Sequence, residues 1–186
     1  MISKQTVIPV ISSMKGLETF LLTPLKVCIL QDLHINHVKD MIKIAHENNR
    51  EVIVHIELVQ GISNDEYGAQ YLCQQFKIDG MISSKPKIIE VAMKSKVLAI
   101  LRIFMMDSKS LKRSLQIIDT LNPDVVEFLP ALTYEIFPEL LKNLKMEVWA
   151  GGLIKNATQI KAVLATGIKR VTVSDLELAK LNAKLD

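Results

Sequence analysis

The chain of 186 residues is 49% hydrophobic and 23% charged, and its net charge is only +3. These values exclude an intrinsically disordered chain, which would carry fewer apolar residues and a larger net charge. Two cysteines are too few for a secreted domain that depends on disulfide bonds. The length predicts one domain, spanning residues 1–186, that can bury a sizeable core.

The N-terminal stretch has no features of a secretory signal. Met1–Ser13 holds one short apolar run broken by Pro9, and no apolar stretch approaches the roughly 20 residues that span a bilayer. Cys28 lies in a strand-like run and Cys73 in a helical pattern, and neither has a CxxC or Cys/His partner nearby. Both are expected to be buried thiols. We therefore expect a reduced, cytoplasmic protein with no membrane partner.

Short apolar runs rich in β-branched residues recur along the whole chain at intervals of roughly 18 to 28 residues, the length of a strand, a helix and two loops. Most runs are apolar throughout rather than alternating, which predicts burial on both faces of a parallel sheet. The eight predicted strands are Val7–Ile11, Lys26–Leu30, Val52–Ile56, Gly80–Ser83, Val97–Ile103, Asp124–Phe128, Glu147–Ala150 and Arg170–Ser174.

Helical patterns fill the gaps between these runs. Asn64 is the expected N-cap of the segment Asn64–Phe76. Pro138 predicts that the segment Thr133–Leu144 is broken or begins near it. The helices after the first and fourth strands are expected to have only one or two turns. The predicted helical segments are Asn36–Asn48, Asn64–Phe76, Asp107–Leu121, Thr133–Leu144 and Asn156–Thr166.

Eight strands that alternate with helices allow an open doubly wound sheet or a closed (β/α)8 barrel. No GxGxxG follows Val7–Ile11, so a dinucleotide-binding open sheet is unsupported. Eight evenly spaced units favour an α/β fold of the compact (β/α)8 TIM-barrel type. Such barrels typically have about 250 residues, so this one must have short loops and some reduced helices.

The last two predicted strands carry the pattern of a phosphate site. In EVWAGGLIKN, Gly151 and Gly152 let the backbone approach an anion, and Lys155 lies within reach of the same loop. In KRVTVSD, Ser174 supplies a hydroxyl and a backbone N–H from the next loop. Barrels commonly bind phosphate between these two loops. The alternative is a turn that merely needs two glycines.

The other strand ends are unusually polar, and the carboxyl ends of barrel strands converge on one mouth. Charged groups inside apolar strands are costly to bury without a purpose, which favours a polar ligand or a metal there. Structural alternatives remain open: His55 could be a satisfied core histidine, and Arg102 could simply neutralise Glu127 or Glu57. The candidates at the mouth are Asp32, His34, His55, Glu57, Arg102 and Glu127.

A small phosphorylated polyol fits a phosphate site that faces carboxylates, because ionised carboxylates accept hydrogen bonds from hydroxyl groups. Mg²⁺ is the competing occupant for three carboxylates, whereas no ligand cluster suggests zinc. The pairs Asp32/His34 and His55/Glu57 each share one strand face if the strand extends that far. Lys26 and Lys169 lie at strand starts, on the opposite rim, so no lysine inside a predicted strand offers a Schiff base. No catalytic residue is assigned.

Several segments resemble the glycerol-3-phosphate-responsive antiterminator family. The resemblance runs nearly end to end, from Ile8 to about Leu178, and the part around NDEYGAQYLCQ is the most specific. The segments are LQDLHI (Leu30–Ile35), VHIELVQGISNDEYGAQYLCQ (Val54–Gln74), DGMISSK (Asp79–Lys85), LRIFMMDS (Leu101–Ser108), NPDVVEFLP (Asn122–Pro130) and AGGLI (Ala150–Ile154).

The resemblance implies a TIM-barrel regulator of glycerol catabolism that senses glycerol 3-phosphate. It implies binding to the leader of a messenger RNA and prevention of premature transcription termination, without enzymatic activity and without a cofactor. The oligomeric state is left open. An enzyme acting on a small phosphorylated substrate is the alternative. Adjacent helices could merge several basic side chains into one RNA-binding stripe. Its main candidates are Lys85, Lys87, Lys109, Lys112 and Arg113, and Lys94 and Lys96 lie around the same helix as the first two.

Overall fold

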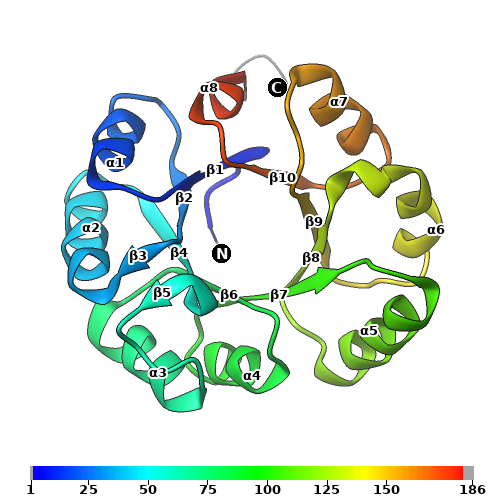
Figure 1. Ribbon diagram of the computed structural model, residues 1–186, viewed down its shortest axis with the longest axis horizontal. Coiled ribbons are helices and arrows are strands. Elements are labelled where there is room, and N and C mark those ends of the chain that lie inside the picture. The colour runs from blue at the N-terminus through cyan, green and yellow to red at the C-terminus, as the bar shows by residue number, and fades with distance from the viewer. Residues whose placement is uncertain (1, 182–186) are drawn as a thin grey trace.

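Eight parallel strands close into a barrel in the order β1-β10-β9-β8-β7-β6-β4-β2, and the helices form a ring around it (Figure 1). The computed structural model describes residues 2–181, so residue 1 and residues 182–186 of the predicted domain lie outside the described part. The barrel strands are β1 (Val7–Ile11), β2 (Val27–Leu30), β4 (Glu51–His55), β6 (Gly80–Ser83), β7 (Leu98–Phe104), β8 (Val125–Leu129), β9 (Glu147–Gly151) and β10 (Arg170–Val173).

The closed barrel confirms the predicted TIM-barrel class and excludes the open sheet. Each barrel strand lies within one residue of its predicted ends, because a continuously apolar run marks a strand covered on both faces. The sequence did not predict a short two-stranded ladder outside the barrel, formed by β3 (Leu33–His34) and β5 (Val59–Gln60). Two-residue strands are too short to show a periodic pattern.

Two expectations about the helices were wrong. The N-cap of α3 is Asp65 rather than Asn64, and its carboxylate accepts the backbone N–H groups of Tyr67 and Gly68. The most reduced helices are α6 and α8 rather than those after the first and fourth strands. The helices are α1 (Met14–Leu21), α2 (Ile35–Glu47), α3 (Glu66–Tyr71), α4 (Pro86–Lys94), α5 (Ser108–Leu121), α6 (Phe137–Leu141), α7 (Ala157–Ala165) and α8 (Leu176–Ala179).

The expected break in the fourth helical segment is confirmed. A 3₁₀ turn, Ala131–Ile136, precedes α6, which begins at Phe137 with Pro138 in its first turn. Proline is tolerated there because the first backbone N–H groups of a helix have no partner within it. The helix α3 continues into a π-helical turn, Leu72–Phe76.

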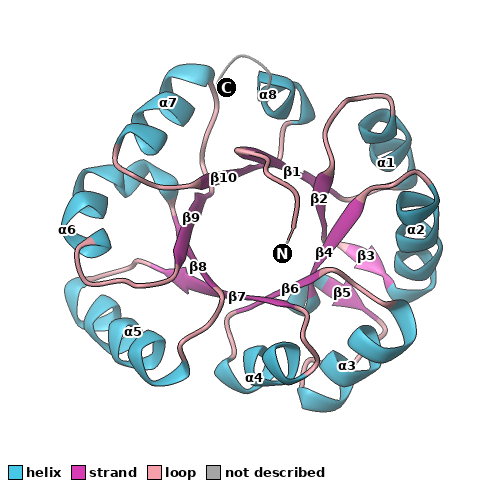
Figure 2. Ribbon diagram, turned by 180° about the vertical axis from the view of Figure 1, so that it is seen from behind, coloured by secondary structure: helices cyan, strands magenta, loops and turns pink. Residues whose placement is uncertain are grey.

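The core has two layers. The inner layer fills the barrel with isoleucine and valine side chains around Trp149, and Ile2 packs against it. The N-terminal segment therefore lies inside the ring of strands, as the view from the other end of the barrel shows (Figure 2). The outer layer lies between the strands and the helices and includes Cys28 and Cys73, both buried free thiols. Burial raises the pKa of the Cys28 thiol to about 12. No helix within residues 2–181 is long and apolar enough to cross a membrane.

Candidate functional site

A cavity of about 380 Å³ opens at the carboxyl ends of the barrel strands. This is the end at which (β/α)8 barrels place their functional residues, because the loops after the strands converge there. The wall combines apolar side chains with a few polar groups, as small-molecule sites do. The lining residues are Val10, Gln31, His55, Glu57, Leu58, Ser84, Arg102, Phe104, Leu129, Gly152, Thr172, Val173 and Ser174.

A buried ion pair lies at one side of this cavity. Arg102 on β7 stands opposite Glu127 on β8, and its Nε donates to Glu127 Oε2 at 2.7 Å. The other carboxylate oxygen, Oε1, accepts the Thr172 hydroxyl at 2.6 Å. Glu127 is completely buried and does not line the cavity. Both its oxygens are thus satisfied, as a buried carboxylate requires.

The absence of a side chain at Gly151 makes room for this arrangement. A Cβ atom at residue 151 would come within 2.0 Å of Thr172 Oγ1 and 3.0 Å of Glu127 Oε1. Gly151 is therefore required by the Thr172–Glu127 hydrogen bond behind the cavity. Gly151 does not line the cavity, whereas its neighbour Gly152 does.

We expect Gly151→Ala to lower the free energy of unfolding by about 2–3 kcal/mol, because the new methyl group must displace the Thr172 hydroxyl. Chemical denaturation measures this change. Thr172→Ala is the matched partner, since it removes the clashing oxygen. The double variant should lose clearly less stability than the sum of the two single variants. Simple additivity would contradict the proposed steric cause.

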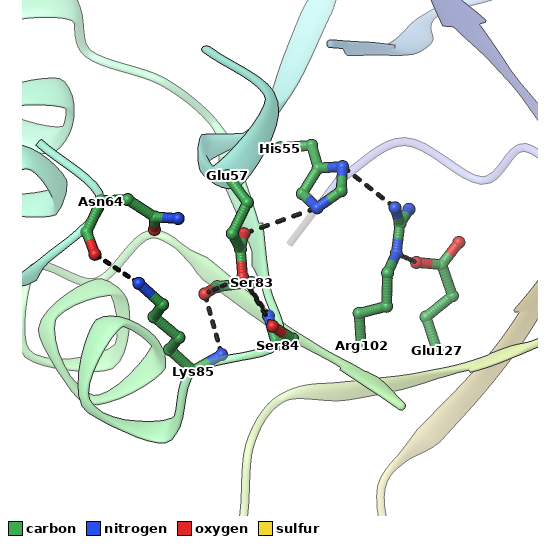
Figure 3. Close-up of polar contacts among 8 residues, drawn as sticks. All are labelled: His55, Glu57, Asn64, Ser83, Ser84, Lys85, Arg102 and Glu127. Atoms are coloured by element: carbon green, nitrogen blue, oxygen red, sulfur yellow. Dashed lines mark hydrogen bonds and ion pairs between the residues drawn. The ribbon is translucent and has the colours of Figure 1, made fainter. Parts of the chain in front are cut away.

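His55 connects the arginine to a second carboxylate (Figure 3). Arg102 Nη1 lies 3.0 Å from His55 Nδ1, and because arginine can only donate, Nδ1 accepts and the proton resides on Nε2. That nitrogen lies 3.4 Å from Glu57 Oε2. Burial, reinforced by the Arg102 charge and opposed by the Glu57 charge, lowers the pKa of His55 to about 4. The imidazole is therefore neutral at pH 7.

The lowered pKa of His55 predicts acid sensitivity of the fold. An imidazole in the unfolded chain titrates near 6.5, so between about pH 6.5 and pH 4 the unfolded state binds more protons than the folded state. Stability should therefore fall with decreasing pH across this window, by up to about 3 kcal/mol. Urea denaturation at several pH values measures the effect. In His55→Asn, whose side chain does not titrate, this part of the pH dependence should disappear; an unchanged profile would assign it to other groups.

Glu57 follows β4 in a single 3₁₀ turn, Ile56–Leu58, and joins the cavity to the next loop. Its Oε1 accepts hydrogen bonds from the Ser83 hydroxyl at 2.8 Å, the Ser84 N–H at 2.6 Å and the Ser84 hydroxyl at 2.9 Å (Figure 3). Three donors hold the carboxylate in one orientation and hold the start of the β6–α4 loop against the mouth.

The predicted phosphate residues are only partly brought together. Gly152, with a φ of +83°, and Ser174 line the same cavity from the loops after β9 and β10. A positive φ favours glycine, which explains why the loop has one there. Lys155 is exposed and does not line the cavity; its backbone N–H donates to the Gln159 side chain at 2.7 Å.

Asp32 and His34 do not line the cavity. The barrel strand β2 ends at Leu30, and Asp32 follows it with a φ of +55°. Its exposed carboxylate accepts the side-chain amide N–H of Gln31, a residue of the cavity wall, at 3.0 Å. His34 instead lies in the outer strand β3, where its Nδ1 caps α2 by accepting the Asn36 N–H at 3.3 Å. The two residues therefore do not share the face of a barrel strand.

The predicted basic residues lie on α5 and around the start of α4, and these two helices are in contact. Lys85 Nζ donates to the backbone carbonyl of Asn64 at 2.7 Å, and Lys87 Nζ lies 3.7 Å from Glu66. The remaining candidates, Lys109, Lys112 and Arg113, belong to the first half of α5. The two lysines near α4 are thus already engaged within the protein.

Two polar residues of the cavity wall, Ser84 and Thr172, were not predicted, and Gln31 stood out only as a polar residue after the second strand. Thr172 had a signal, because it lies two residues before Ser174 and alternate residues of a strand face the same side. Ser84 had no such signal in the sequence, because its place on the wall is shown only by its hydrogen bonds to Glu57. Within residues 2–181, no group of three His, Cys, Asp or Glu side chains is arranged to hold a metal ion.

Comparisons with known proteins agree with this geometry. The model of the family described as glycerol-3-phosphate responsive antiterminator matches residues 7–178. The crystal structure of a glycerol uptake operon antiterminator regulatory protein from Listeria monocytogenes is 33% identical, with a TM-score of 0.91 over 95% of this chain and 96% of that chain. The structure of a glycerol uptake operon antiterminator-related protein from Thermotoga maritima is 27% identical, with a TM-score of 0.83. The match covers 96% of this chain and 99% of that chain.

More distant matches carry less information. The curated relative, "Uncharacterized protein YgcP" of Escherichia coli, is 24% identical over 148 residues, which are 80% of this chain and 78% of that protein. A deoxyribose phosphate aldolase from Aeropyrum pernix has a TM-score of 0.72 at 13% identity, covering 98% of this chain and 92% of that chain. At that identity the likeness shows the barrel fold alone.

Proposed function

Because the chain belongs to the glycerol-3-phosphate responsive antiterminator family, we propose that it binds glycerol 3-phosphate at the barrel mouth and, in that state, binds the leader RNA of a glycerol-catabolism operon. The family match over residues 7–178 carries the proposal. The cavity supports the proposal independently, because its volume of about 380 Å³ suits a small ligand. Its wall carries Arg102, together with Gly152 and Ser174 from the loops after β9 and β10.

In this proposal the phosphate group lies between Gly152 and Ser174, with the Arg102 guanidinium as its cationic partner. Arg102 uses Nε and Nη1 for Glu127 and His55, which leaves Nη2 for the ligand. Lys155, in the loop after β9, adds positive charge near the same end. The glycerol hydroxyl groups face His55, Glu57 and Gln31, which offer hydrogen-bond donors and acceptors.

We assign no resident metal to the mouth. Glu127 is neutralised by Arg102, and Glu57 Oε1 is already occupied by three donors. Of the oxygens of these two carboxylates, only Glu57 Oε2 has no hydrogen-bond partner, and a divalent cation takes six or more oxygen ligands. Mg²⁺ should therefore leave the affinity for glycerol 3-phosphate unchanged.

We also assign no catalytic residue. The described strands of residues 2–181 contain no lysine, so the barrel offers no in-strand amine for Schiff-base chemistry. The lowered pKa of His55 and the Nδ1 contact to Arg102 leave that imidazole a poor general base near neutral pH. A binding site that senses its ligand without transforming it fits these features.

Isothermal titration calorimetry with glycerol 3-phosphate, glycerol and inorganic phosphate tests the ligand assignment. We expect one site per chain and tighter binding of glycerol 3-phosphate than of either fragment, with and without Mg²⁺. Absence of binding by glycerol 3-phosphate would contradict the proposal. Incubation of the pure protein with the same ester should leave it chemically unchanged, and sustained turnover would support the enzymatic alternative.

A further inference from the structure

Lysines gather on the barrel face opposite the cavity, where the strands begin. In the sequence they are far apart, but each lies in the segment that leads directly into a barrel strand, and closure of the barrel brings these segments to one end. Six of the eight strands are preceded in this way by an exposed lysine. We call this set the lysine ring; its members are Lys4, Lys26, Lys77, Lys96, Lys145 and Lys169.

The lysine ring is not neutralised by neighbouring acids. Within residues 2–181, none of its six members forms an ion pair within 4 Å. Arg50, which precedes β4, differs in that its Nη2 is engaged by the backbone carbonyl of Thr23 at 3.0 Å. The positive charges of the ring are thus available to an external anion.

Several carboxylates at the same end are held by internal partners. Glu51 accepts the Ser3 N–H at 2.8 Å, and Asp79 accepts the Val52 N–H at 2.7 Å. Asp124 accepts the Ala99 N–H at 2.9 Å. Glu51 thus ties the segment before β1 to β4, whereas Asp79 and Asp124 tie the segments before β6 and β8 to the neighbouring strands β4 and β7.

Glu147, at the start of β9, completes this pattern. Its Oε1 accepts both the indole N–H of Trp149 at 2.6 Å and Arg170 Nε at 2.8 Å. These four acids therefore serve the fold through five internal contacts. Asp119, on α5, is an exposed carboxylate that borders a hollow together with Lys145, so it offsets part of the positive charge there. The six lysines of the ring still leave this end positive.

The ring is also hollowed. A groove of about 1140 Å³ lies between the segments that lead into β1, β9 and β10. Lys4, Lys145 and Lys169 line it, together with Lys142 and apolar side chains that include Leu144. A groove with several lysines and a single carboxylate, Glu147, which is already engaged, suits a polyanion that runs along it.

We propose that the lysine ring, and the groove it borders, is the surface that contacts the phosphates of RNA; the identity of the RNA rests on the proposed function. Lysine–phosphate contacts of this kind position an RNA without reading its bases. The surface shares Lys96 with the stripe on α4 and α5 expected from the sequence but otherwise differs from it. In that stripe, Lys85 and Lys87 already have partners. The lysine ring also lies at the opposite end of the barrel from the ligand, so the two can be occupied together.

The test uses fluorescence anisotropy with the labelled leader RNA of a glycerol-catabolism operon and an unrelated RNA of equal length, from 50 to 200 mM salt, with and without glycerol 3-phosphate. The ring variant is K4Q/K145Q/K169Q. We expect weaker binding of RNA and a salt dependence whose logarithmic slope falls by about 2, since each lost single-strand phosphate contact removes about 0.7. Its melting temperature and its affinity for glycerol 3-phosphate should match those of the unchanged protein.

Two variants with the same change in charge complete the design. The first replaces exposed lysines on α1, α2 and α7 and should bind RNA like the unchanged protein; it is K15Q/K39Q/K161Q. The second carries the changes on α5 and represents the rival surface; it is K109Q/K112Q/R113Q. Loss of binding in the α5 variant alone, with the ring variant unaffected, would overturn the lysine ring.

The remaining outcomes separate this inference from the proposed function. If the unchanged protein binds both RNAs equally and without glycerol 3-phosphate, and the ring variant loses that binding, the surface is supported and ligand-gated recognition fails. If glycerol 3-phosphate strengthens binding of the leader but the ring variant behaves like the unchanged protein, the function stands and the ring is wrong. If the unchanged protein binds neither RNA at 50 mM salt, both are wrong.

Discussion

Replacing Arg102 by methionine is expected to lower the free energy of unfolding by about 3–5 kcal/mol, the largest loss of stability from any single change proposed for this chain. Methionine keeps much of the volume but leaves the Glu127 carboxylate, which is completely buried, without its cationic partner. The Nδ1 atom of His55 loses its donor as well. Chemical denaturation at pH 7 measures the change.

A second substitution separates the lost charge pairing from the lost packing. In R102M/E127Q the buried group is neutral, and the amide oxygen can still accept the Thr172 hydroxyl. We expect the double variant to recover most of the stability, since an unpaired buried charge costs more than a buried amide with a hydrogen bond. It should still fail to bind glycerol 3-phosphate. If the double variant were as unstable as R102M, packing rather than charge would explain the loss.

Replacing Gly152 by aspartate is expected to weaken the binding of glycerol 3-phosphate by at least about 100-fold. At an effective dielectric constant near 20, two unit charges 4 Å apart repel by about 4 kcal/mol, and the added carboxylate faces the same cavity as the proposed phosphate group. A side chain fits physically, because a Cβ atom at residue 152 meets Leu129 Cδ2 at an ordinary 3.5 Å. Calorimetric titration measures the affinity.

Gly152→Asn is the matched control. Asparagine and aspartate have nearly the same shape, and both tolerate a positive φ better than other side chains do, so the strain at φ +83° is shared. The asparagine variant should bind glycerol 3-phosphate far more tightly than the aspartate variant. Equal affinities of the two variants would place the phosphate elsewhere in the cavity.

The barrel itself was predictable because its strands are buried on both faces. Runs such as Val7–Ile11 and Gly80–Ser83 are apolar throughout, and their ends coincide with those of the observed strands. The N-cap of α3 was not, because Asn64 and Asp65 are both good caps and only the backbone conformation chooses between them. The lengths of α6 and α8 depend on packing at the barrel rim, which leaves no pattern in the sequence.

The site was predictable in its residue types but not in its pairing. Arg102 and Glu127 were both recognisable as charges inside apolar strands, and the sequence left open whether Arg102 neutralises Glu127 or Glu57. The register between β7 and β8 decides for Glu127. Asp32 was misplaced because β2 ends at Leu30 and Asp32 follows it with a left-handed backbone, and aspartate gives no warning of that conformation as a glycine would. The fully buried state of Glu127 follows from Gly151 and Thr172, which lie on two other strands.

The lysine ring could not be recognised from the sequence, because only the closed barrel brings its members together. Its members are separated by roughly 20 to 50 residues for the most part, so no window of the sequence contains a basic cluster. Only the common role of these residues, as the last exposed positions before a strand, brings them together. The basic stripe on α5 was visible because Lys109, Lys112 and Arg113 are close in the chain, and that proximity says nothing about which surface contacts RNA.

The proposed function requires above all that glycerol 3-phosphate controls the binding of RNA. The most direct measurement is the dissociation constant for the leader RNA of a glycerol-catabolism operon, at one fixed salt concentration, with and without saturating glycerol 3-phosphate. We predict that glycerol 3-phosphate tightens this binding at least fivefold and that glycerol does not, consistent with a coupling free energy of about 1 kcal/mol or more. Identical dissociation constants in the two conditions would contradict the proposed function.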